Sequence, residues 1–217
     1  GLAVGGAVMQ SMLRNPIADP YTTGVASGAS FGVALYLMLD IVILPVSGYA
    51  LSITTNAAIL ALIPTAVIVL ISRRKNMTPT TTILAGVAVM YVFRAATSTM
   101  TLMADSDAVE QLYLWNTGSI VGARWDNIWI VASVVIAGIV LLLALSRQMT
   151  IMTSGENSAV SMGIRTRFVR SVSLIIVAVM TAVIVGYTGT IGFMGLIAPH
   201  VARVLVGSNL RYLIPCS

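Results

Sequence analysis

Apolar residues occupy long segments of this chain, and short polar or proline-containing segments separate them. A helix needs about 20 mostly apolar residues to cross a bilayer, and helices usually end before a proline, as at Pro16, Pro45 and Pro79. The pattern predicts an all-α, polytopic bundle of transmembrane helices whose last segment is short or broken. The predicted spans cover residues 1–13, 22–44, 48–72, 80–104, 127–146, 168–187 and 191–206.

Composition supports a membrane protein. Hydrophobic residues make up 58% of the chain and charged residues 9%, whereas soluble domains carry about 25% charged residues. We expect the chain to be an internal part of a longer polytopic protein, incomplete at both ends. A net charge of +5 would suggest nucleic acid in a soluble protein. Here the distribution of the charge describes membrane topology instead, so no nucleic-acid partner is predicted.

Basic and acidic residues alternate between successive loops. Positive charge concentrates on the cytoplasmic side of membrane proteins. One of the intervening loops holds Asp105, Asp107 and Glu110, so it is predicted to lie outside. The loops predicted to be cytoplasmic are 14–20, 73–79, 147–167 and 207–211.

Glycines in two segments have a spacing that favours close helix packing. Gly24, Gly28 and Gly32 form a double GxxxG pattern, which lets another backbone approach closely. In the second segment glycines recur every three positions, and we expect a strip without side chains along one face of a helical turn. Pro199 removes a backbone donor there, so this helix is predicted to be broken. The glycines of the strip are Gly186, Gly189, Gly192 and Gly195.

Arg94 lies inside the predicted span 80–104. Arginine at the centre of a membrane helix costs about 2.5–3.5 kcal/mol, and such charges usually face a cavity or a partner. Arg94 is followed by three polar residues, Thr97, Ser98 and Thr101, which would contribute hydroxyl groups to the same surface of the helix. Two interpretations remain open: these residues line a polar cavity, or Arg94 pairs with a carboxylate from helices outside this chain.

Residues that bind cofactors or catalyse reactions are not recognisable in this sequence. Its only lysine, Lys75, lacks the preceding glycines of a phosphate-binding loop. The single histidine and single cysteine, His200 and Cys216, have no partner set for a metal. We therefore predict no catalytic residue, no metal site and no cofactor, and we assign His200 a buried structural role.

Five segments in order resemble the FecCD-like family of ABC-importer permeases, the iron–siderophore, haem and vitamin B12 class. The most informative is GTIGFMGLIAPHVAR at 189–203. LAGVAVMYVFRAATSTM resembles the family's fifth helix, and SGENSAVSMGIRTRFVR resembles the cytoplasmic loop that docks the ATPase. The five segments are 1–32, 84–100, 112–128, 154–170 and 186–217.

The resemblance implies a type II ABC importer, with residues 1–217 as a single transmembrane permease domain. Its partners would be a second permease subunit in a homodimer, cytoplasmic ATP-binding subunits, an extracytoplasmic substrate-binding protein and the lipid bilayer. The permease itself would not be an enzyme, since the ATPase subunits hydrolyse ATP. It would lie in the cytoplasmic (inner) membrane of a bacterium or archaeon and carry a metal chelate such as ferric siderophore, haem or cobalamin. The fifth helix lines the family's translocation pathway, so Arg94, Thr97, Ser98 and Thr101 become pathway candidates.

Residues 147–167 form the predicted coupling loop. Ser154 and Glu156 can begin a short helix, and Gly163 can end it in a left-handed conformation. By composition alone, a solvated loop with a marginal helix is equally reasonable, whereas the resemblance implies ATPase docking. The candidate coupling residues are Glu156, Asn157, Ser158, Ala159, Met162 and Gly163.

Two other classes of protein compete with the importer. A secondary transporter also uses broken helices near the membrane midplane, but it would need an ion-coupling carboxylate there. All seven acidic residues of this chain lie in predicted loops or at span ends. A membrane scaffold subunit would need neither GTIGFMGLIAPH nor a structured cytoplasmic loop.

Overall fold

The computed structural model describes residues 1–46, 48–72, 79–121 and 125–217. Every regular element in these ranges is a helix and none is a strand, which confirms the predicted all-α fold. The elements are α1 (Leu2–Leu13), η1 (Pro20–Thr23), α2 (Val25–Leu39), α3 (Tyr49–Ser72), α4 (Pro79–Thr101), α5 (Ser106–Thr117), α6 (Trp125–Thr153), α7 (Glu156–Ser161), α8 (Thr166–Thr188), α9 (Met194–Val206) and α10 (Leu210–Cys216). The basic cluster predicted at 73–75 lies outside the described residues.

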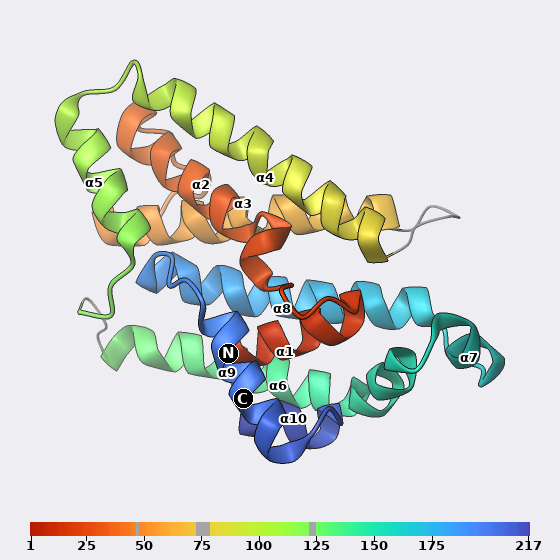
Figure 1. Ribbon diagram of the computed structural model, residues 1–217. Coiled ribbons are helices and arrows are strands. Elements are labelled where there is room, and N and C mark those ends of the chain that lie inside the picture. The colour runs from red at the N-terminus through yellow and green to blue at the C-terminus, as the bar shows by residue number, and fades with distance from the viewer. Residues whose placement is uncertain (47, 73–78, 122–124) are drawn as a thin grey trace.

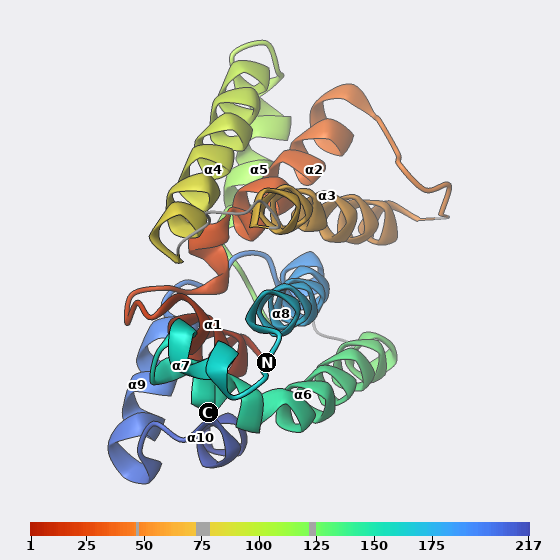
Figure 2. The same ribbon diagram turned by 90° about the vertical axis from the view of Figure 1, so that its right-hand side faces the viewer.

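Helix α8 runs through the middle of the bundle (Figures 1 and 2). Helices α2 to α5 lie on one side of it, and α1, α6, α9 and α10 lie on the other. α8 contacts α1, α3 and α6 directly. Four helices, α3, α4, α6 and α8, are long and apolar enough to cross a bilayer, as expected of a multi-pass membrane protein.

Helix α1 is short but almost completely enclosed. Apart from Ser11, each of its residues is buried. A helix that is apolar on all sides belongs in the interior of a bundle. α1 packs against α6, α8, α9 and α10, so it forms the core of one half of the molecule.

Helix α2 is shorter than the predicted span 22–44. It ends at Leu39, because Asp40 adopts a left-handed conformation with φ 53°. The chain then returns along α3, where the buried amide of Asn56 donates to the Ile41 carbonyl at 2.6 Å and accepts from the Ile43 N–H at 3.0 Å. These side-chain bonds replace the backbone bonds that a longer helix would have made.

Helix α6 extends to Thr153, beyond the predicted end of its span at 146. The first residues of the predicted loop 147–167 are therefore helical. Ser146 and Thr150 donate their hydroxyls to the Leu143 and Ser146 carbonyls, which lets polar residues continue the helix. The loop proper is α7 and its two short connections.

The break near the C-terminal end precedes Pro199. α8 ends at Thr188, and the non-helical connection includes two residues with positive φ, Gly189 at 67° and Phe193 at 65°. α9 then continues through Pro199 to Val206. The prediction of one helical glycine strip is wrong, because Gly189 and Gly192 lie in this connection. The predicted burial of His200 is also wrong, since its side chain is exposed on α9.

Candidate functional site

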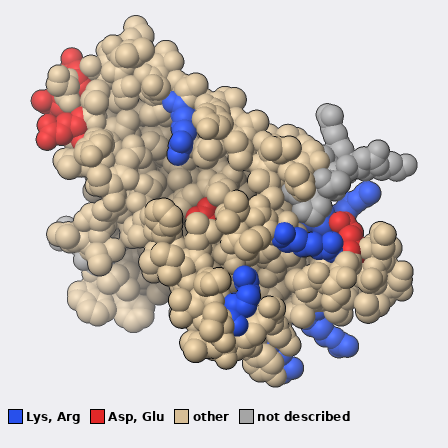
Figure 3. All heavy atoms as spheres, viewed as in Figure 1, with Lys and Arg blue, Asp and Glu red and all other residues tan. Residues whose placement is uncertain are grey.

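Helix α7 lies at the end of the molecule opposite α5 (Figure 1). Figure 3, in the same view, shows acidic side chains gathered at the α5 end and most basic side chains toward the α7 and α10 end. Asp105, Asp107 and Glu110 are the exposed acids of the α5 end, whereas Arg165 and Arg167 are exposed beside α7. The folded chain therefore separates charge along the direction of its long helices.

An ion pair fixes α7 to the start of α8. The guanidinium of Arg170 donates to Glu156 Oε2 at 3.0 Å, with 6% of the Arg170 side chain and 34% of the Glu156 side chain exposed. The Thr166 hydroxyl donates to the other carboxylate oxygen at 3.3 Å. Arg14 at the end of α1 reaches the same region and donates to the Met152 carbonyl at 2.7 Å. Glu156 is thus engaged inside the chain and is not a free surface acid.

The pKa of the Glu156 carboxyl reflects this environment. Burial raises its pKa. The hydrogen bond and the charge of Arg170, together with Thr166 and Arg14, lower it by more than burial raises it. The net shift is downward, so the carboxylate is ionised wherever the protein functions near neutral pH.

The outward face of α7 differs from the predicted coupling set. Ala159 is completely buried in the bundle core, and Glu156 is turned inward. Val160 and Met162 are 57% and 60% exposed, and Val160 was missed by the sequence prediction. Apolar residues on a short helix look the same in sequence whether they face a core or a partner. The candidates that remain on the exposed face are Asn157, Ser158, Met162 and Gly163.

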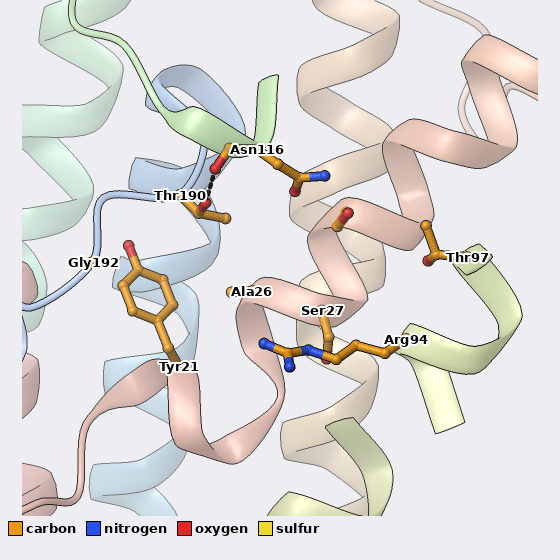
Figure 4. Close-up of a pocket in the computed structure, with 9 residues that line it drawn as sticks. Tyr21, Ala26, Ser27, Arg94, Thr97, Asn116, Thr190 and Gly192 are labelled. Carbon is orange, nitrogen blue, oxygen red and sulfur yellow. Dashed lines mark hydrogen bonds between the residues drawn. The ribbon is translucent and has the colours of Figure 1, made fainter. Parts of the chain in front are cut away.

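Arg94 and Thr97 lie together at a polar cavity of about 460 Å³. Helices α2, α4 and α5, the segment at η1 and the connection between α8 and α9 all contribute to its wall. In Figure 4 the Arg94 side chain extends from α4 past Ser27 toward the side of the cavity where Tyr21 lies. The lining residues are Tyr21, Ala26, Ser27, Ser30, Arg94, Thr97, Asn116, Thr190 and Gly192.

The other two pathway candidates do not line this cavity. Ser98 is exposed on α4, and Thr101 is the last residue of the helix. The Thr101 hydroxyl donates to the Ser98 backbone carbonyl at 2.7 Å, so its proton is used within α4. Tyr21, Asn116 and Thr190 complete the wall in their place, and only the fold brings these distant residues together.

Backbones of α1 and α9 meet at two glycines. A Cβ on Gly6 would lie 1.8 Å from the Gly195 carbonyl oxygen, so only glycine fits there. Pro199 cannot donate to that same carbonyl, its partner four residues earlier in a helix. The buried Gln10 amide donates to it instead at 3.2 Å, and Arg203 donates to Gln10 Oε1 at 2.8 Å. Pro199 therefore does not break α9, because α1 supplies the missing donor.

The three glycines of the double GxxxG pattern have two different structural roles. A Cβ on Gly28 would lie 2.5 Å from the Leu60 carbonyl oxygen, and one on Gly32 would lie 2.4 Å from that of Asn56. These two glycines allow α2 and α3 to pack closely. Gly24 lies before α2, where its left-handed φ of 87° ends η1. By contrast, a Cβ added to Gly192 would have nothing within 4 Å, so this glycine does not serve packing.

One protein-family model matches the whole chain. It is described as the FecCD transport family, and it covers residues 1–217. The chain belongs to the FecCD family. The resemblance of the five segments is thereby confirmed over the whole chain.

Two FecCD relatives illustrate the family. The cobalamin import system permease BtuC of Halobacterium salinarum is 35% identical over 217 residues, which is 100% of this chain and 57% of that protein. The iron(3+)-hydroxamate import system permease FhuB of Bacillus subtilis is 33% identical over 223 residues, again 100% of this chain and 55% of that protein. This chain thus spans less than two thirds of the length of these relatives.

A solved structure shares the fold. It is described as an inward-facing conformation of a metal-chelate type ABC transporter. The TM-score is 0.89 at 26% identity, and the match covers 99% of this chain and 67% of that one. The helical bundle described above is therefore the FecCD permease fold.

Proposed function

We propose that this chain is the membrane-spanning part of a permease subunit in an ABC importer that moves a metal chelate across the cytoplasmic membrane. Its membership of the FecCD family and its fold support this proposal. Relatives that carry cobalamin and ferric hydroxamate in their names support a chelate as the substrate class. Partner subunits would hydrolyse ATP, and the permease would bind no cofactor of its own.

The proposed assembly has four components. Residues 1–217 form one transmembrane permease domain within a longer subunit, and two such subunits pair as a homodimer. Two ATP-binding subunits lie on the cytoplasmic side, and a substrate-binding protein delivers the chelate from outside. The segregation of charge along the bundle supports the orientation, because basic residues favour the cytoplasmic side.

We propose that helix α7 is the element to which the ATPase docks. It is short, it lies at the basic end of the molecule, and it presents Val160 and Met162 to the outside. Exposed apolar residues rimmed by polar ones mark interaction surfaces. The Glu156–Arg170 pair would pass a displacement of α7 directly into α8. Glu156 and Ala159 thus hold α7 in place, while its outer face meets the partner.

Charge placed on the outer face of α7 should release the ATPase. We expect Val160→Asp and Met162→Asp to abolish co-purification of the ATP-binding subunits and ATP-driven uptake, because an unpaired charge would be buried in the interface. Thermal unfolding of the permease should stay unchanged, since both side chains are exposed. Ser154→Asp, at an exposed position just before α7, is the matched control and should retain the ATPase. Full retention in both α7 variants would refute docking at this face.

Thiol labelling tests the orientation. In a Cys216→Ser background, Asn157→Cys should react with an impermeant maleimide only from the cytoplasmic side, and Asp107→Cys only from outside. Both positions are exposed on the chain, so access is decided by the membrane alone when the permease is labelled in membranes that lack the ATP-binding subunits. Reaction of both cysteines from one side would contradict the proposed topology.

A secondary transporter remains the competing function. It would require a carboxylate within the bundle, and Asp19 is the buried acid among the described residues, at 4% exposure. Its Oδ1 accepts the Thr22 N–H at 2.9 Å, and the Thr22 hydroxyl lies 3.3 Å from the Asp19 N–H. This capping box explains Asp19 as a helix cap, which favours the importer.

A further inference from the structure

We propose that the Arg94 cavity is a binding site for chelates that carry negative charge through carboxylate or similar oxygen groups. The inference rests on the proposed import function and assigns that function a substrate class. At about 460 Å³, the cavity has the size of a small-molecule site. It lies beside α4, about two helical turns before that helix ends at Thr101, in the half of the span nearer the acidic end.

Arg94 gives this cavity an unbalanced positive charge. No aspartate or glutamate lines it, and within the described parts of the chain the ion pair is formed by Arg170 and Glu156, not by Arg94. A guanidinium inside a membrane span is costly unless it faces water or a partner. An open polar cavity provides the water, and an anionic ligand would provide the partner during transport.

The hydrogen-bond donors of the wall favour the same ligand. The Tyr21 hydroxyl accepts the Ile191 N–H at 3.1 Å, so its own proton is available to the cavity. The Asn116 amide contributes further donors from α5. By contrast, Ser27 and Thr97 donate their protons to backbone carbonyls at 2.8 and 3.0 Å, and present lone pairs. Donors from Arg94, Tyr21 and Asn116 thus come from three different elements of the same cavity wall.

Arginine suits this task because its planar group can hold two carboxylate oxygens at once, with hydrogen bonds stronger than those between neutral groups. Lysine would preserve the charge but lose this geometry. Neutral chelates would meet the same wall without a charge to match the guanidinium. We therefore expect discrimination by ligand charge, and Arg94 is the residue that sets it.

Binding to the complete permease complex in detergent tests this inference. The probes are iron-labelled ferric citrate, which is anionic, and iron-labelled ferrichrome, a neutral ferric trihydroxamate. The wild-type complex should bind ferric citrate more tightly than ferrichrome. Arg94→Gln should weaken ferric citrate binding by about tenfold or more, because a charged hydrogen-bonding partner is lost. The affinity of Arg94→Gln for ferrichrome should stay unchanged. The affinity of Arg94→Lys for ferric citrate should lie between those of wild type and Arg94→Gln. Arg147→Gln, an exposed arginine of α6, should match wild type.

Each other outcome overturns the inference. Equal or tighter binding of ferrichrome by wild type would show that the cavity does not select anions. Equal losses for both probes would show a general defect, and a lower unfolding temperature for Arg94→Gln would show a structural ion pair. ATP-driven uptake distinguishes the two proposals. Wild type that imports no chelate contradicts the import function, whereas uptake that is indifferent to ligand charge contradicts only the role of Arg94.

Discussion

Glu156→Ala is expected to destabilise the permease far more than Arg170→Met, although the two residues form one ion pair. Removing Glu156 leaves the guanidinium of Arg170 buried without a counter-charge, which should cost about 3 kcal/mol, the lower end for a broken buried pair. Removing Arg170 leaves a carboxylate that water can reach, since 34% of the Glu156 side chain is exposed. Methionine then fills the space, so a change within about 1 kcal/mol is expected.

Denaturant unfolding of the purified permease measures this asymmetry, with Glu110→Ala as an exposed control that should stay within about 0.5 kcal/mol of wild type. The pH provides a second check. The pKa of Glu156 is lower in the folded chain than its ordinary value of 4.5, so its contribution is complete above that value and declines as the pH falls through the folded pKa. The gap between wild type and Glu156→Ala should therefore be widest near neutral pH and narrow below pH 4.5. Equal costs for the two substitutions would contradict the prediction.

Gly6→Val should prevent α1 from packing against α9. The first added carbon would already lie 1.8 Å from the Gly195 carbonyl oxygen and 2.7 Å from its Cα. These are backbone atoms, which cannot rotate away, so the cost should reach or exceed the upper range of overpacking, about 3 kcal/mol. The helices would separate, and Gln10 would lose its bond to Gly195. We expect a loss of folded protein by size-exclusion chromatography.

Gly192→Ala is the matched control for this substitution. Gly192 belongs to the same predicted glycine series as Gly195, but nothing lies within 4 Å of its added Cβ. The unfolding temperature of Gly192→Ala should therefore equal that of wild type. A similar defect in both variants would mean that the α1–α9 contact is not what Gly6 protects.

Long apolar segments made much of this fold predictable. The four long helices α3, α4, α6 and α8 correspond to apolar runs in the sequence, because burial in lipid requires such runs. Positions where tertiary contacts decide the backbone were not predictable. Asp40 ends α2 and Phe193 precedes α9 in left-handed conformations. Aspartate adopts this conformation more often than most residues, but it is unusual for a bulky residue such as phenylalanine. Asn56, distant in sequence, stabilises the first of these turns.

The candidate sites show the same division. The sequence located Arg94 inside a span and a short helix near 156–163, since both depend on local composition. It did not reveal which side of α7 faces outward, because Ala159 and Val160 are both small and apolar. Nor did it join Tyr21, Asn116 and Thr190 to Arg94. Their meeting depends on how η1, α5 and the α8–α9 connection pack around α2.

The side chain of Gln10 compensates for the missing backbone donor of Pro199. Pro199 leaves the Gly195 carbonyl without a donor within α9, and Gln10 supplies one from α1. A residue other than proline at 199 would give this carbonyl a second donor from α9, and the carbonyl can accept both bonds because its oxygen has two lone pairs. A mutation of Gln10 alone would strand the carbonyl. Loss of Gln10 leaves the carbonyl unsatisfied only while Pro199 is present, so the order of substitutions at these two positions, which lie near opposite ends of the chain, should matter.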